Sequence, residues 1–156
     1  MKSIATSAAL LVACAALLST VAAAKERGTP AEAKAMLDKS VEHFKSAGRD
    51  AAIKDFNAGK APFYDRDLYV VCVDAKHILV ANGGYPAYVS TSADAFVDAK
   101  GVPLGKALWE AAGKNPNGSI NYPHLNPMTK KIEDKTTFYS QVADDLLCGV
   151  GAYSSP

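Results

Sequence analysis

Apolar side chains first recur with the period of a helix, shortly after a uniformly hydrophobic N-terminal stretch. Leu37, Val41 and Phe44 are spaced so that they share one helical face. Residues 29–32, TPAE, supply the threonine N-cap, the proline at the first helical position and the glutamate of a capping box. The pattern predicts a helix over residues 30–46 with one buried face.

A shorter helix and then a change of period follow. Asp50 is placed to cap a helix that carries Ile53 and Phe56 on one face. Residues 67–74 then alternate with the period of a strand, and residues 77–82 are apolar enough to form its hairpin partner. The first half of the chain therefore predicts two helices followed by a hairpin.

The second half predicts one helix and three more strands. Residues 85–114 are irregular at first and become helical around Leu104 and Leu108, and three strands follow over residues 119–124, 131–143 and 146–153. Sequential strands with short connections form antiparallel sheets. We therefore expect an α+β fold, in which the long N-terminal helix packs on a roughly five-stranded antiparallel sheet. The segment 85–114 should cover the other face and enclose a cavity.

The N-terminus has the arrangement of a secretory signal. Lys2 precedes the apolar stretch 4–24, which ends in three alanines just before the charged Lys25. This predicts a signal peptide over residues 1–24 and a single mature domain over residues 25–156. An uncleaved anchor is the alternative, because about 20 apolar residues can span a bilayer.

The charge balance excludes some partners. The whole chain has 17 basic and 16 acidic residues, and removal of residues 1–24 would leave the two numbers equal. A neutral chain with no basic patch lacks the electrostatic footprint of a nucleic-acid-binding protein. We see no second hydrophobic span after residue 24, so we expect no transmembrane signalling part in this chain.

Several segments resemble a known family. They are residues 67–74, DLYVVCVD; residues 118–139, which contain a strand, an N-P turn and a lysine-initiated aromatic strand; and residues 144–153, which end in CGVGAY. Together with the leading helix, these segments resemble the single Cache domain, a PAS-like sensor domain of bacterial extracytoplasmic receptors, in a stand-alone secreted form. The resemblance implies the binding and sensing of a small molecule, such as a small organic acid, and a role in signal transduction.

Two segments depart from that family pattern. Residues 74–77, DAKH, stand where the family places a glycine in the turn, and residues 83–88, GGYPAY, replace a shorter segment. The second of these tends to lie over the ligand pocket in the family. The identity of the ligand therefore does not carry over.

The cysteines support an oxidising compartment, either periplasmic or secreted. Loss of the signal would remove Cys14 and leave Cys72 and Cys148, an even pair. The Cache arrangement places the first and last strands of the sheet side by side, which implies a Cys72–Cys148 disulfide. Two buried free thiols are the alternative. Two isolated cysteines do not have the spacing of zinc ligands, and we predict no metal site.

Candidate ligand-binding residues gather where the family has its pocket. No nucleophile elbow, zinc-protease motif or phosphate-binding loop occurs, so we expect neither an enzyme nor a cofactor. Aromatic residues with a polar tip suit a small site that orients a polar ligand, and a lysine ammonium matches a carboxylate. His124 shares a strand face with Tyr122 and is either pocket-lining or exposed. The predicted ligand-binding residues are Tyr88, Trp109, Tyr122, His124, Lys135 and Tyr139.

Two functions from different classes remain open. The first is an extracytoplasmic small-molecule binding module, whose partners would be a carboxylate ligand and a membrane receptor. The second is a structural or protein-interaction domain with no small-molecule ligand, which would dimerise through the N-terminal helix. Each of the aromatic and lysine residues above is also compatible with a simple core or surface position.

Overall fold

Two helices lead the chain into a six-stranded antiparallel sheet. The computed structural model describes residues 27–98 and 100–154, so the predicted signal peptide lies outside the described residues. The elements are α2 (Pro30–Ala47), α3 (Arg49–Asn57), β1 (Tyr64–Asp65), β2 (Leu68–Asp74), β3 (Leu79–Asn82), η1 (Pro86–Tyr88), η2 (Ala93–Ala95), α4 (Leu104–Lys114), β4 (Asn117–Leu125), β5 (Ile132–Ala143) and β6 (Leu146–Tyr153).

The capping box predicted from the sequence is present at the start of α2. The Thr29 hydroxyl accepts a hydrogen bond from the Glu32 amide at 3.2 Å, and a Glu32 carboxylate oxygen accepts one from the Thr29 amide at 2.7 Å. Two of the free amides of the first turn are thereby bonded. The buried face of α2, which includes Met36 and Leu37, packs against β2, β5 and β6.

The sheet has the strand order β1-β2-β6-β5-β4, and β3 pairs with β2 beside this path. All pairings are antiparallel. The first long strand, β2, and the last strand, β6, are neighbours, as the Cache resemblance implies. The α+β prediction is confirmed. The strand not foreseen is β1, which has two residues and is too short to give a period-two pattern.

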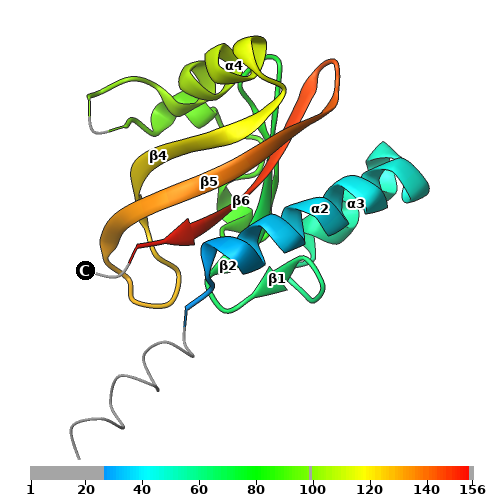
Figure 1. Ribbon diagram of the computed structural model, residues 1–156, viewed down its shortest axis with the longest axis horizontal. Helices are drawn as coiled ribbons and strands as arrows, with labels where there is room; N and C mark the ends of the chain where they lie inside the picture. The colour runs from blue at the N-terminus through cyan, green and yellow to red at the C-terminus, as the bar shows by residue number, and fades with distance from the viewer. Residues whose placement is uncertain (1–26, 99, 155–156) are drawn as a thin grey trace, which may run out of the picture.

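Each central strand presents alternate residues to two different layers. In β2, Val70 and Cys72 belong to the core cluster that α2 and α3 cover, whereas Val73 belongs to the cluster on the opposite face, together with Leu108 of α4. Figure 1 shows α2 and α4 on different sides of the sheet. This alternation follows from the two-residue repeat of a strand. Both faces of the sheet are thus covered.

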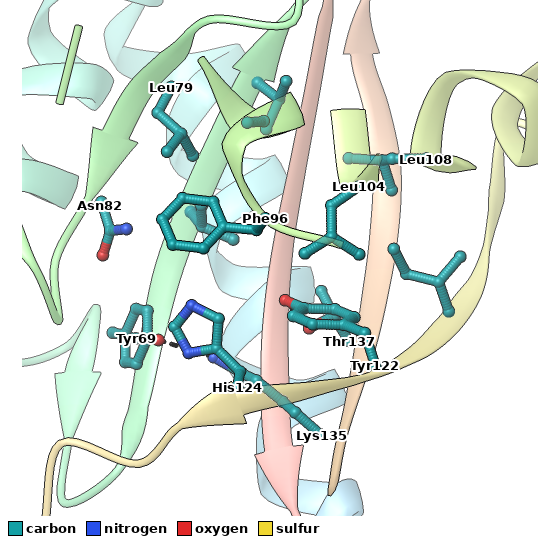
Figure 2. A pocket seen from close by; sticks show the side chains of 14 residues that line it. Tyr69, Leu79, Asn82, Phe96, Leu104, Leu108, Tyr122, His124, Lys135 and Thr137 are labelled. Carbon is teal, nitrogen blue, oxygen red and sulfur yellow. Dashed lines mark hydrogen bonds between the residues drawn. The ribbon is translucent and has the colours of Figure 1, made fainter. Parts of the chain in front are cut away.

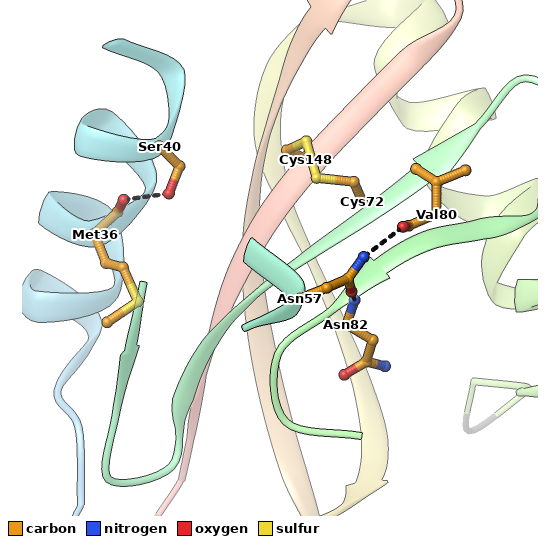
Figure 3. The surroundings of a disulfide bond; sticks show 7 residues. All are labelled: Met36, Ser40, Asn57, Cys72, Val80, Asn82 and Cys148. Carbon is orange, nitrogen blue, oxygen red and sulfur yellow. Dashed lines mark hydrogen bonds between the residues drawn. A yellow bond between two sulfur atoms is a disulfide. The ribbon is translucent and has the colours of Figure 1, made fainter. Parts of the chain in front are cut away.

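The disulfide lies on the face covered by α2 and α3. Cys72 and Cys148 are direct partners in the β2–β6 ladder, their Cα atoms are 4.1 Å apart, and a disulfide joins them (Figure 3). Both side chains are fully buried. The Cys72–Cys148 pairing predicted from the resemblance is confirmed, and the alternative of two free thiols is wrong.

The segment between β3 and β4 covers the other face, as predicted. The Asp94 carboxylate holds it in place, because one oxygen accepts the Lys106 amide at the start of α4 at 2.9 Å. The other oxygen lies 2.7 Å from His77 Nδ1, in the turn between β2 and β3. These two contacts of Asp94 connect η2 to α4 and to the turn between β2 and β3. A cavity lies between this covering segment and the sheet.

Candidate functional site

A cavity of about 50 Å³ lies between the second face of the sheet and the covering segment (Figure 2). A cavity needs roughly 10–15 Å³ by the same measure to hold one water molecule, so this one has room for only a few. Its apolar wall consists of Val71, Val73, Leu79, Ala93, Phe96, Leu104, Leu108 and Ile120. The polar lining consists of Tyr69, Asn82, Tyr122, His124, Lys135 and Thr137.

The glycines of β6 leave room for the Lys135 side chain. Gly149 and Gly151 alternate with the residues that β6 sends to the helix-covered face. A Cβ on Gly151 would collide with Lys135 Cε, and it would lie 2.5 Å from the Thr137 hydroxyl. In the run CGVGAY, Cys148, Val150 and Ala152 therefore pack into the core on one face of the sheet. On the other face the two glycines leave space for the side chains of β5.

Lys135 places its amine inside the protein. The side chain is 2% exposed, and Nζ donates a hydrogen bond of 2.8 Å to the Tyr69 hydroxyl. Nζ also lies 4.0 Å from the ring centre of Tyr69 and 4.7 Å from that of Tyr153. Among the described residues no carboxylate pairs with it. Burial lowers the pKa of Lys135 to about 7, and the negative charge of Asp67 opposes this shift only in part.

A chain of hydrogen bonds leads from Lys135 to the end of β4. The Tyr69 hydroxyl, which accepts from Lys135, lies 3.3 Å from the Tyr153 hydroxyl, and Tyr153 donates to the Leu125 carbonyl at 2.8 Å. Burial raises the pKa of both Tyr69 and Tyr153. The two phenols therefore stay neutral and can relay hydrogen bonds without adding negative charge near Lys135.

His124 is a neutral member of this polar end. Its Nδ1 lies 3.0 Å from the Leu125 carbonyl, which can only accept, so Nδ1 carries the proton and Nε2 is left as an acceptor. Burial, followed by the charge of Lys135, lowers the pKa of His124 to about 4. The histidine is pocket-lining, and the alternative of an exposed position is wrong.

Asn82 supplies a further donor. Its side chain is 4% exposed, and its carbonyl oxygen accepts the Tyr85 amide at 2.8 Å, which fixes the orientation of the amide group. The side-chain nitrogen has no hydrogen-bond partner among the residues that the structure describes, and Figure 2 shows it turned toward the cavity. A ligand oxygen would satisfy this donor.

Three of the six predicted ligand-binding residues line the cavity. These are Tyr122, His124 and Lys135. Tyr122 is buried, and its hydroxyl pairs with the Thr137 hydroxyl at 2.9 Å. Since Tyr122 faces Lys135 directly across the β4–β5 ladder, the two strands bring these residues together.

The other three, Tyr88, Trp109 and Tyr139, lie in the hydrophobic cluster around the cavity and not in its lining. The ring of Tyr88 is 5.0 Å from that of Phe96, which occupies the position next to the cavity. Trp109 Nε1 donates to the Asp74 carbonyl at 2.8 Å, and the Tyr139 hydroxyl donates to the Asn115 carbonyl at 3.2 Å. The polar tips of Trp109 and Tyr139 are thus bonded to the backbone.

Some lining residues were not predicted. Tyr69 was within reach of sequence reasoning, because it alternates with Val71 and Val73 and so shares their strand face. Phe96 had no such signal, since it follows a one-turn 3-10 helix in an irregular segment. The position of Phe96 depends on the tertiary contacts of Asp94 with His77 and Lys106, which hold that segment over the sheet.

The sequence matches the family model of the single Cache domain 2 over residues 6–155. The chain belongs to this family. Cache domains are extracytoplasmic sensory modules that bind small molecules, and they are not known as enzymes. The family match confirms the resemblance seen in the sequence. The matched range includes residues 6–24, which belong to the predicted signal peptide. That signal peptide stays a prediction.

Solved structures of chemotaxis and chemosensory proteins share this fold. A methyl-accepting chemotaxis protein from Vibrio parahaemolyticus RIMD 2210633 superposes with a TM-score of 0.66 at 19% identity, over 87% of this chain and 92% of the other. A Cache chemosensory domain described for its carboxylic acid recognition gives a TM-score of 0.59 at 14% identity, over 90% and 99%. The periplasmic sensor domain of a chemotaxis protein gives 0.58 at 16%, over 93% and 100%.

A comparison with proteins of curated function finds no significant match. Within residues 27–98 and 100–154, no helix is long and apolar enough to cross a membrane. The same residues contain no group of three His, Cys, Asp or Glu side chains that could hold a metal ion.

Proposed function

We propose that this Cache domain binds a small carboxylate in the cavity, with Lys135 as the counter-ion of the carboxylate group. The observation that carries the proposal is an amine that is 2% exposed, lines a cavity and has no carboxylate partner among the described residues. A buried charge without a partner is costly, so a site of this kind favours a ligand of opposite charge.

The size and polarity of the cavity support a short ligand with one polar end. The polar groups gather around Lys135 and Tyr69, whereas Leu104, Leu108 and Ile120 contribute an apolar wall. A carboxylate with a short alkyl group matches this division. A structural neighbour, at 14% identity, is described for carboxylic acid recognition, which agrees with this ligand class.

Three further groups are proposed to orient the ligand. The Asn82 side-chain nitrogen would donate to a ligand oxygen, His124 Nε2 would accept from a ligand hydroxyl, and Tyr122 would limit the length of the alkyl group. Tyr88, Trp109 and Tyr139 would act indirectly, because they pack around the lining residues. They remain in the proposal as supports of the site and not as groups that touch the ligand.

The cellular context is part of the same proposal. We infer that residues 1–24 direct export, that the mature domain starts at Lys25, and that it senses its ligand outside the cytoplasm. The domain would pass the signal to a membrane receptor, and α2 would be the contact for a second copy. Mass spectrometry of protein from the native host would detect a mature N-terminus at Lys25, and detection of intact Met1 would contradict the cleavage after Ala24.

A thermal-shift screen tests the binding function. The probes are acetate, propionate, lactate and pyruvate, and acetamide and propionamide serve as uncharged controls of similar shape. A ligand at 100 times its dissociation constant stabilises the folded protein by about 2.7 kcal/mol. We expect stabilisation by at least one acid and by neither amide. Equal effects of acids and amides would contradict the role of Lys135, and no effect of any probe would favour a structural or protein-interaction domain.

A further inference from the structure

The environment of Lys135 offers an ammonium ion little compensation. An ammonium group has three N–H donors. One is taken by the Tyr69 hydroxyl. The ring faces of Tyr69 and Tyr153, at 4.0 and 4.7 Å from Nζ, attract a cation but supply no full negative charge. A buried ionisable group in such surroundings tends to lose its charge. The empty cavity therefore favours the neutral amine.

The surrounding elements do not supply a counter-ion by direct contact. Asp67, before β2, is fully buried, but its carboxylate oxygens accept the Gly28 amide at 2.6 Å and the Asn126 side chain at 3.3 Å. Glu133, on the same strand as Lys135, is bound by Arg27 at 2.7 Å. The remaining titratable groups that face Lys135 are Tyr69 of β2, Tyr122 and His124 of β4 and Tyr153 of β6, all of which are neutral near pH 7.

A bound carboxylate changes this balance. It would place a negative charge beside Nζ in a site of low polarity, where an opposite charge stabilises the ammonium form. The proton affinity of the amine must then rise on binding. By linkage, the affinity for the carboxylate must fall wherever the empty protein has lost that proton.

We propose that each carboxylate bound in the cavity brings one proton with it, and that this proton resides on Lys135 Nζ. The inference rests on the proposed function and specifies what that site recognises, namely an anion and a proton together. The reaction is an association in which the neutral amine gains a proton from solvent and no bond of the ligand breaks. Since burial lowers the pKa of Lys135 to about 7, the uptake would occur above that pH.

This property would make the domain respond to acidity as well as to the ligand. Above about pH 7 the dissociation constant should increase about tenfold for each pH unit, because one proton enters with each ligand. Below that pH the amine is already charged and the dissociation constant should be constant, until the ligand itself becomes protonated. A weak acid would thus be sensed more strongly in acidic surroundings.

Titration calorimetry in buffers of different ionisation enthalpy measures the proton directly. The probe is the tightest binder among acetate, propionate, lactate and pyruvate, used with the wild-type domain at pH 6.0 and pH 8.5 (about one unit below and one and a half above the midpoint). We expect an uptake near one proton per ligand at the higher pH and near zero at the lower.

A second measurement follows the lysine itself and needs no ligand. In protein labelled with ¹³C at lysine Cε, one lysine signal should titrate near pH 7 in the empty domain, well below the reference lysine value of about 10.4. Lys135→Arg identifies that signal and, if it still binds the probe, should bind with no proton uptake, because arginine stays charged.

The outcomes separate the two proposals. Binding of a probe without proton uptake at pH 8.5 would overturn this inference and leave the binding function intact. The same holds if all lysine signals titrate above about pH 9.5. If none of the four acids binds, the proposed function fails and this inference fails with it.

Discussion

Glu133 and Lys135 stand two residues apart on β5 and are residues of opposite charge type. Glu133 has an oppositely charged partner within the chain, whereas Lys135 has none among the described residues. Arg27 bonds both oxygens of the Glu133 carboxylate, at 2.7 and 2.9 Å, and Asn126 and Thr129 each add a hydrogen bond of 2.8 Å. Lys135 Nζ donates one hydrogen bond, to a tyrosine hydroxyl, and otherwise lies over two tyrosine rings. The chain itself satisfies the first charge and leaves the second without a counter-ion.

This difference indicates a structural role for the Glu133 carboxylate and leaves the Lys135 amine available for a ligand. The bonds of Glu133 tie the segment before α2 to the start of β5 and the turn after β4, and they lower the pKa of Glu133 to about 2, mainly through Arg27. The burial of Lys135 lowers its pKa instead of stabilising its charge. Glu133 already has its partners, whereas Lys135 would gain a counter-ion from the proposed ligand.

The largest expected effect is the loss of binding in Lys135→Met. Methionine fills a similar volume but offers no charge, and removal of one partner of a buried charge pair costs about 2–5 kcal/mol of binding free energy. Calorimetry with the tightest of the four acids should show affinity reduced by about 30-fold or more. The same replacement at the exposed Lys131 is the control and should change binding by less than about 0.5 kcal/mol. Equal affinity of wild type and Lys135→Met would remove Lys135 from the site.

The second effect concerns stability against pH in the empty domain. Because the pKa of Lys135 is about 7 in the folded protein and 10.5 as the reference value, the unfolded chain binds more protons between these pH values. The free energy of unfolding should therefore rise with pH, by up to about 1.4 kcal/mol per unit, or about 3 kcal/mol between pH 7 and pH 9.5. Chemical denaturation should show this rise in the wild type relative to Lys135→Met. Parallel curves for the two proteins would contradict a neutral buried lysine.

Gly151→Ala tests whether the glycines of β6 make the space that Lys135 occupies. The new Cβ would meet Lys135 Cε, and overpacking of a dense site costs about 1–3 kcal/mol. We expect lower stability in denaturation and weaker carboxylate binding, because the amine is displaced. Gly113→Ala in α4 is a matched control, since its Cβ would meet nothing within 4 Å and alanine favours a helix. If both variants behave alike, the glycines of β6 do not position Lys135.

The smallest effect is expected at the satisfied charge. Glu133→Gln keeps the shape but weakens the bonds to Arg27, and at a side chain that is 10% exposed this should cost roughly 1–2 kcal/mol of stability at pH 7. Carboxylate binding should be unchanged. Since the folded pKa of about 2 lies below the reference value of 4.5, the contribution is present above pH 4.5 and is lost as the pH falls toward 2. An equal acid sensitivity of wild type and variant would contradict this role.

The sequence determined the elements and the faces of the sheet. The capping box fixed the start of α2, and the period-two pattern placed Tyr122 with His124 and Lys135 with Thr137 on shared strand faces. These properties depend on neighbours within a few positions along the chain. The family resemblance added the neighbouring positions of β2 and β6, from which the disulfide followed.

Only the tertiary structure decided which of these side chains line the cavity and which charge lacks a partner. Trp109 and Tyr139 have the right residue type, but each finds a backbone carbonyl on an element that is remote in sequence. The pairing of Glu133 with Arg27 spans 106 positions, and the enclosure of Lys135 combines β2, β4 and β6. The pKa of a buried group depends on its desolvation by such distant contacts, and no local pattern of residues encodes that quantity.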